Sequence, residues 1–97
     1  MDWEALVSEI TGRHPEIRVS SMFGMPCLKR DTGKVLAGSW KDGGITVKLT
    51  DVSKRDAALA LPGVALFDPG MGRVMKEWVH VPTSQSERWV DLVEQAI

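Results

Sequence analysis

Hydrophobic side chains near both ends of the chain recur at i, i+3, i+4 and i+7, the spacing of a helix with one apolar face. The two stripes are Trp3, Leu6, Val7, Ile10 and Trp89, Leu92, Val93, Ala96. Asp2 is a favourable N-cap for the first helix, and Gly12 is expected to end it. Ser84 and Glu87 have the spacing of a capping box, which predicts that the last helix begins there.

Apolar and polar residues alternate in the middle of the chain, which predicts strands. The strands are expected over residues 17–22, 25–30, 34–40 and 45–50, and later over 64–67 and 75–81. In the fourth of them, Ile45, Val47 and Leu49 are expected to face the core. Thr46 and Lys48 are expected to face solvent, so this sheet should have one wet face.

Turn residues separate the predicted strands. Asp31-Thr32-Gly33 and Asp42-Gly43-Gly44 each join two strands as hairpin connections do, and the glycine-rich loop 68–73 joins the last two. A helix rich in helix-forming residues is expected over 52–61. The order α-β-β-β-β-α-β-β-α, with strands clustered, indicates an α+β fold of two layers, an antiparallel β-sheet with three helices on one face. We expect residues 1–97 to form a single domain.

The composition is that of an ordinary globular domain, with 43% hydrophobic and 26% charged residues, which argues against disorder. A net charge of −1 offers no general attraction to nucleic acid and leaves only a local basic patch for such binding. The single cysteine fits a reducing compartment, and the acidic N-terminal segment is unlike a signal peptide. No apolar run reaches the roughly 18–20 residues of a membrane span. We therefore expect a cytoplasmic protein that does not enter a membrane.

Three sulfur side chains, Met22, Met25 and Cys27, lie close together in the segment SSMFGMPCLKR (20–30). Such soft ligands suit Cu(I), and a thiol can act as a nucleophile. A free cysteine also behaves as a small buried hydrophobe. We interpret Phe23-Gly24 as a tight turn and Cys27 as a buried, inert thiol on the strand that follows. Met25 and Cys27 would share one face of that strand, and ligands lined along a strand do not converge on one point, so we expect no metal there.

Nucleophilic chemistry would require a base beside Cys27, and His80 is the candidate. Its place between Val79 and Val81 puts it on the solvent face of a strand, so we expect no such dyad. The loop DPGMGR (68–73) lacks the glycine spacing of phosphate-binding loops and leads into a strand. We therefore expect no catalytic residue, no metal and no cofactor.

Lys48, Arg73, Lys76 and Trp78 are the candidate binding residues. Lys76, Trp78 and His80 share one strand face by period two, with Arg73 just before them. Beside Lys48 they would form a small basic and aromatic surface for an anion, nucleic acid or a protein partner. The alternative, which we favour, is that Trp78 belongs to the core and the lysines form a solvated rim.

The sheet should also present an edge with unpaired backbone groups. The spacing of Trp40 and Trp78 assigns them to neither the core nor an interface. On a sheet face that no helix covers, either ring would mark an interface. We therefore predict a homodimer that forms through the sheet.

Several segments together resemble the TfoX N-terminal domain family. They are MFGMPCLK (22–29), GKVLAGSW (33–40), TVKL (46–49), LPGVALFDPGMGRVMKEWVHVP (61–82) and the closing Trp-bearing helix. The resemblance covers residues 20–97 and implies a two-layer fold with an antiparallel sheet, related to the YjbR-like and secretion-chaperone-like folds. Secretion-chaperone-like folds are commonly dimeric. The competence regulators of the family carry a second, C-terminal domain that these 97 residues do not include.

The resemblance implies a small, non-enzymatic regulatory or interaction domain, and this is the function we expect. The first alternative is a nucleic-acid-binding regulator that uses the face of Lys48, Lys76 and Trp78. The second is a small-ligand or redox module centred on Cys27.

Overall fold

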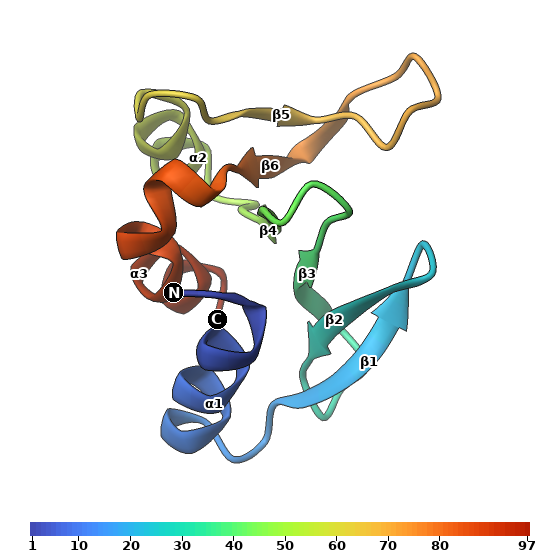
Figure 1. Cartoon of the computed structure of the whole chain (residues 1–97), viewed down its shortest axis with the longest axis vertical. Coiled ribbons are helices and arrows are strands. Elements are labelled where there is room, and N and C mark those ends of the chain that lie inside the picture. The colour runs from blue at the N-terminus through green and yellow to red at the C-terminus, as the bar shows by residue number, and fades with distance from the viewer.

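A computed structural model describes all residues, 1–97. The elements are α1 (Trp3–Arg13), β1 (Arg18–Met22), β2 (Met25–Lys29), β3 (Val35–Ser39), β4 (Ile45–Lys48), α2 (Val52–Leu59), β5 (Ala65–Phe67), β6 (Met75–Val81), the 3-10 helix η1 (Thr83–Arg88) and α3 (Trp89–Ala96). The six strands form one antiparallel sheet in the order β1-β2-β3-β4-β6-β5. All three α-helices lie on one side of it (Figure 1). The predicted two-layer α+β fold and its element order are confirmed.

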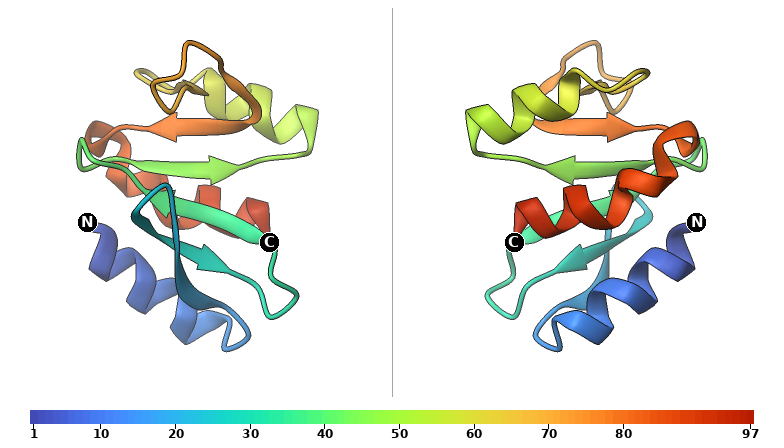
Figure 2. Two further views of the ribbon diagram at one scale, coloured as in Figure 1. Left: turned by 90° about the vertical axis from the view of Figure 1, so that its right-hand side faces the viewer. Right: turned by 90° about the vertical axis from the view of Figure 1, so that its left-hand side faces the viewer.

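The main core lies between the helices and the sheet. Its fully buried members include Leu6 and Ile10 of α1, Val47 of β4 and Trp89 of α3. The three positions of β4 and its C-terminal extension that were predicted to face the core are confirmed, because Ile45, Val47 and Leu49 all join it. The sheet twists strongly, and the strands turn progressively from β6 to β1 behind the helices (Figure 2). Twisted strands let three short helices cover one face of a six-stranded sheet.

Strand β3 contains an irregularity that the alternating pattern does not predict. Leu28 pairs with Ala37, but the next residue of β2, Lys29, pairs with Val35. Leu36 is therefore an extra residue on β3, a β-bulge. Leu36 and Ala37 are both buried in the main core although they are neighbours in sequence.

Two predicted helix boundaries are wrong. Gly12 lies inside α1, which runs on to Arg13 and is closed by the His14 N–H donating to the carbonyl of Ile10. The Ser84–Glu87 pair makes no side-chain cap, because residues 83–88 form a 3-10 helix that continues into α3.

Candidate functional site

The open face of the sheet, the side away from the helices, carries an aromatic cluster of Phe23, Trp40 and Phe67. The Phe67 ring meets the Trp40 ring edge-on with a centroid separation of 4.7 Å, and its centroid lies 6.3 Å from that of Phe23. Phe67 is fully buried, Trp40 is half-buried, and Phe23 is 52% exposed. Phe23 directly follows β1, Trp40 directly follows β3, and Phe67 is the last residue of β5. The cluster therefore joins three hairpins of the sheet.

Phe23 occupies an unfavourable backbone conformation. It forms a two-residue turn with Gly24 between the paired residues Met22 and Met25, and the φ angles of Phe23 and Gly24 are 55° and 73°. This confirms the predicted tight turn, and two positive φ angles match the twist of a hairpin. Glycine adopts this conformation freely, but for other residues the left-handed region costs roughly 1–2 kcal/mol. Asparagine, aspartate or glycine would suit the turn better, so turn formation does not explain the phenylalanine.

The expectation that Thr46 faces solvent is wrong, although it does face the open side. Thr46 is 1% exposed and lies opposite Gly38, whose carbonyl accepts a long hydrogen bond of 3.4 Å from its hydroxyl. A Cβ at Gly38 would lie 3.2 Å from the methyl carbon of Met22. Met22 of the β1–β2 hairpin therefore packs over Gly38. This contact shields part of the open face from solvent, although the sequence predicted that this face would be solvated.

Cys27 is fully buried, as predicted. It lies on the open face between Ser20 and Gly38, while its neighbour Leu28 faces the helices. Met25 lies two residues before Cys27 on the same face of β2, and the turn places Met22 of β1 opposite Met25 on this face. No group of three or more His, Cys, Asp or Glu side chains is placed to hold a metal ion.

We expect the Cys27 thiol to be inert in the folded protein. Burial raises its pKa, against smaller opposing effects of Lys29 and the backbone N–H of Ser20. Both burial and a low thiolate fraction slow attack on a disulfide reagent. The native protein should react with a bulky aromatic disulfide on the order of a hundredfold more slowly than the urea-unfolded chain. Equal rates in stopped-flow absorbance would show that the thiol is accessible.

A shallow groove of about 280 Å³ borders the aromatic cluster. Its lining residues are Trp40, Asp42, Ala65, Leu66, Phe67, Asp68 and His80. His80 is half-buried, so it is not the freely solvated histidine that was expected. Its Nε2 lies 2.8 Å from the Asp42 carboxylate but outside hydrogen-bond geometry, and this buried nitrogen has no other partner. The near neighbour of the imidazole is thus a carboxylate and not the Cys27 thiol.

The structure brings together three of the four predicted binding residues. Lys48 pairs with Trp78 across β4 and β6, and Lys76 lies two residues earlier on the same face. Arg73 lies apart, exposed in the loop between β5 and β6. Trp78 is only 7% exposed, which agrees with the interpretation of a packed ring and leaves Lys48 and Lys76 as its rim.

An ionic network between α1 and α3 was missed from the sequence. His14, the C-cap residue of α1, places its Nε2 2.9 Å from Glu94 Oε2. Arg13 lies 3.3 Å from the other Glu94 oxygen and 2.6 Å from Glu9. The i, i+4 spacing of Glu9 and Arg13 on a helix is a signal of an ion pair that the sequence does contain. The contact with Glu94 leaves no such signal, because Glu94 is 80 residues from His14 and reaches it only when the two helices pack.

This network makes stability depend on pH. The hydrogen bond from His14, and then that from Arg13, lowers the pKa of Glu94 against partial desolvation. A carboxyl whose pKa is lower in the folded state stabilises the fold above its unfolded pKa of about 4.3 and loses that contribution as pH falls through the folded value. We expect Glu94→Gln to lower the free energy of unfolding at neutral pH and to converge with the wild type in acid. Urea titrations at several pH values test this, and a constant difference down to strong acid would contradict it.

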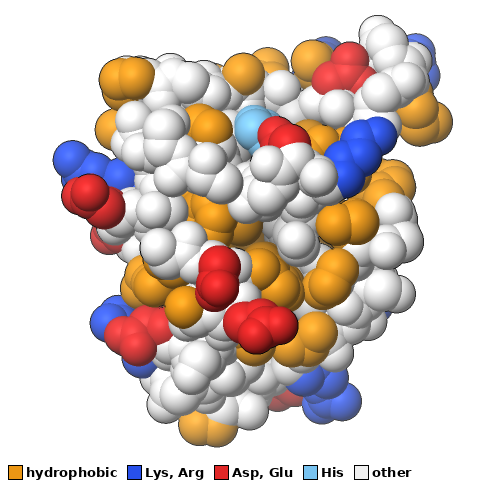
Figure 3. Space-filling model, viewed as in Figure 1, with side chains coloured by type: hydrophobic (Ala, Val, Ile, Leu, Met, Phe, Trp, Pro, Cys, Tyr) orange, Lys and Arg blue, Asp and Glu red, His pale blue; other side chains and the backbone are white.

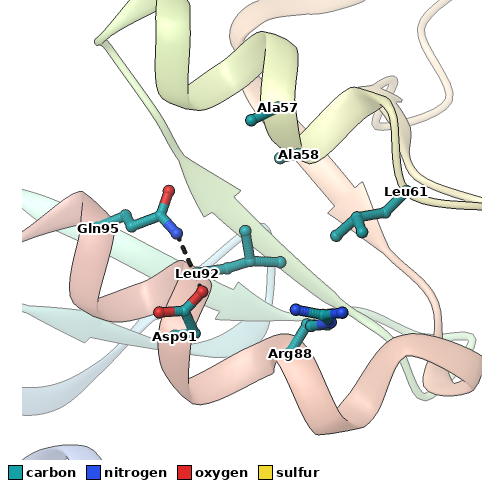
Figure 4. Close-up of a pocket in the computed structure, with 7 residues that line it drawn as sticks. All are labelled: Ala57, Ala58, Leu61, Arg88, Asp91, Leu92 and Gln95. Atoms are coloured by element: carbon teal, nitrogen blue, oxygen red, sulfur yellow. Dashed lines mark hydrogen bonds between the residues drawn. The ribbon is translucent and has the colours of Figure 1, made fainter.

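A second hollow lies between α2 and α3 and was not anticipated either. It measures about 150 Å³ and is lined by Ala57, Ala58, Leu61, Arg88, Asp91, Leu92 and Gln95. Figure 4 shows the two alanines of α2 on one wall and Leu92 on the other, with the Arg88 guanidinium between the helices. Gln95 donates to Asp91 across its rim. The hollow reflects small alanine side chains at the helix contact.

No family model, curated protein or solved structure matches the chain. No helix is both long enough and apolar enough to span a bilayer. The most unusual feature of the open face is its half-exposed aromatic cluster of Phe23, Trp40 and Phe67.

Proposed function

We propose that this protein is a small, non-enzymatic interaction domain of the cytoplasm, with the regulatory role that the resemblance to the TfoX N-terminal family implies. Its partner-binding surface is the Phe23 side of the open face. One observation carries the proposal: Phe23 is 52% exposed and has the only positive φ among the non-glycine residues. Strained backbone persists where the surrounding structure or the function requires it.

The surroundings of Phe23 support a binding role. Met71 and Val74, in the loop between β5 and β6, are also exposed, at 75% and 49%. The β1–β2 and β5–β6 hairpins both project away from the helices (Figure 1), and hydrophobic side chains gather over this side of the molecule (Figure 3). Exposed apolar side chains that gather on one side are typical of surfaces that bind protein. Phe67 supports Phe23 from beneath, as a buried base holds an aromatic anchor in an interface.

A protein partner is favoured over nucleic acid. A ring that stacks on bases must be accessible to them. The Trp78 side chain is only 7% exposed, so it cannot serve as such a platform. Nucleic-acid binding draws much of its affinity from the counterions that Lys and Arg release from the phosphates. Lys48 and Lys76 alone would release few of them, and the chain as a whole has a net charge of −1. The redox alternative has equally little support, because the Cys27 thiol is buried.

The test compares immobilised wild-type protein with Phe23→Asn as bait in lysate of the source cell, with quantitative mass spectrometry as the readout. Asparagine suits the left-handed turn, so the fold is retained while the aromatic anchor is lost. Val52→Ser is the matched control, because Val52 is similarly exposed, at 59%, on α2 across the molecule. We expect a protein that binds the wild type and Val52→Ser at least about tenfold more strongly than Phe23→Asn. Equal recovery by all three baits would contradict a binding role for Phe23.

A further inference from the structure

The two edges of the sheet differ in how well they are protected against pairing with another strand. The sheet begins at β1 and ends at β5. Strand β5 has only three residues, and its register with β6 shifts between Leu66 and Phe67. Short and irregular edge strands resist pairing with a further strand. The β5 edge is therefore protected.

Strand β1 has none of these protections. Its five residues, RVSSM, pair with β2 in an unbroken register from Arg18 to Met22. It contains no proline, lysine or bulge, and Arg18 is its only charge. None of the backbone hydrogen bonds outside the helices and ladders involves residues 18–22. Val19 is 51% exposed, which is unusual for an apolar side chain on a strand beside the core residue Leu28.

The register shows which backbone groups of β1 are free. A two-residue turn closes on a hydrogen-bonded pair, here Met22 and Met25, and such pairs alternate along an antiparallel ladder. The intervening pair of Ser21 with Pro26 agrees with this, because proline has no N–H to donate toward β1. The N–H and C=O groups of Val19 and Ser21 therefore point outward from the edge of the sheet.

We propose that β1 pairs with β1 of a second copy of this chain, antiparallel and about a twofold axis at Ser20. In this register Val19 of each copy lies opposite Ser21 of the other, so each of these pairs exchanges both of its backbone hydrogen bonds. The result is one continuous sheet across two copies, and each copy covers the exposed Val19 side chain of the other.

Charge and helix placement are compatible with this arrangement. The two Arg18 side chains lie at opposite ends of the paired strands, roughly 14 Å apart at about 3.4 Å per residue, beyond the Debye length of about 8 Å. Helix α1 lies behind the β1 end of the sheet (Figure 2). This helix packs against α3 and leaves the Val19 side chain of β1 half-exposed, so it does not cover this edge of the sheet. The surface is self-complementary, which favours a second copy over an unrelated strand.

The test is the mass of the protein in solution over a concentration series, by sedimentation velocity and light scattering. A chain of 10.7 kDa should reach twice that mass with a dissociation constant of about 10–100 µM, the range of a small interface. Ser21→Pro removes an outward N–H and no bond to β2, so it should keep the monomer mass at all concentrations with an unchanged circular dichroism spectrum. Val19→Lys, which adds a charge to the edge, should do the same. A wild type that stays monomeric up to about 1 mM, or a dimer that survives in both variants, would overturn the proposal.

A cross-link locates the axis independently. Ser20 of the two copies would form a non-hydrogen-bonded pair with Cα atoms about 4.5 Å apart, within the range that a disulfide spans. The variant Ser20→Cys in a Cys27→Ala background should form a covalent dimer under mild oxidation. Thr32→Cys in the same background, on the exposed β2–β3 turn, should not. Equal cross-linking of both variants would place the interface elsewhere.

Discussion

Replacing Phe67 with alanine will lower the free energy of unfolding by about 3–5 kcal/mol, the usual range for a buried phenylalanine. The ring is 1% exposed and touches Trp40 edge-on at 4.7 Å. Its removal deletes the centre of the aromatic cluster and leaves a cavity that short hairpins cannot close without distorting their pairing. A domain of this kind is stable by roughly 5–15 kcal/mol, so the variant should be severely weakened.

Urea unfolding followed by circular dichroism measures this loss, with Phe67→Leu as the conservative control. Leucine retains most of the buried volume and should cost less than half as much. A loss below about 1 kcal/mol for Phe67→Ala would mean that the open face is not a packed second core.

Gly44→Ala will lower the free energy of unfolding by about 1–3 kcal/mol, because the added methyl group has no room. A Cβ at Gly44 would lie 2.8 Å from the backbone oxygen of Val81 and 2.9 Å from His80 Nε2. A backbone oxygen in a paired strand cannot rotate aside, so β4 and β6 must separate locally. Disturbing His80 and the turn that holds Asp42 should also alter the groove beside Trp40.

Gly12→Ala is the matched control for Gly44→Ala. It adds the same methyl group inside helix α1, where nothing lies within 4 Å of the new atom. Alanine in a helix interior is favoured over glycine by about 1 kcal/mol, so this variant should be more stable than the wild type. If both variants shifted thermal unfolding in the same direction, the close approach at Gly44 would not be the cause.

The fold was readable from the sequence because local patterns and the global arrangement agree. Ile45, Val47 and Leu49 alternate cleanly, and the positive φ of Gly24 serves the turn that the sequence indicated. Gly12 and the Ser84–Glu87 pair were misread because neither signal is decisive. Glycine is tolerated inside a helix at a modest cost, and a 3-10 turn replaces the side-chain cap.

The candidate site was less readable because it depends on contacts between distant segments. The position of Thr46 in the alternating pattern is that of a solvent-facing residue. Nothing in the sequence of β4 shows that Met22 will pack over Gly38, the residue that pairs with Thr46. Phe67 ends a short strand, and its contacts with Phe23 and Trp40 arise only when three hairpins meet. Phe23 itself left a signal, since an aromatic residue beside Gly24 is unusual in a two-residue turn.

The central claim is that Phe23 is retained for binding and not for stability. It is tested most directly by the free energy of unfolding of Phe23→Asn beside Phe23→Ala. Both variants lose the partial contact with Phe67, worth about 1 kcal/mol, but only asparagine relieves the left-handed strain of similar size. We predict that Phe23→Asn will match the wild type within about 0.5 kcal/mol while Phe23→Ala loses about 1 kcal/mol. A loss of about 2 kcal/mol or more in Phe23→Asn would show that the ring is there to hold the fold, and would contradict the claim.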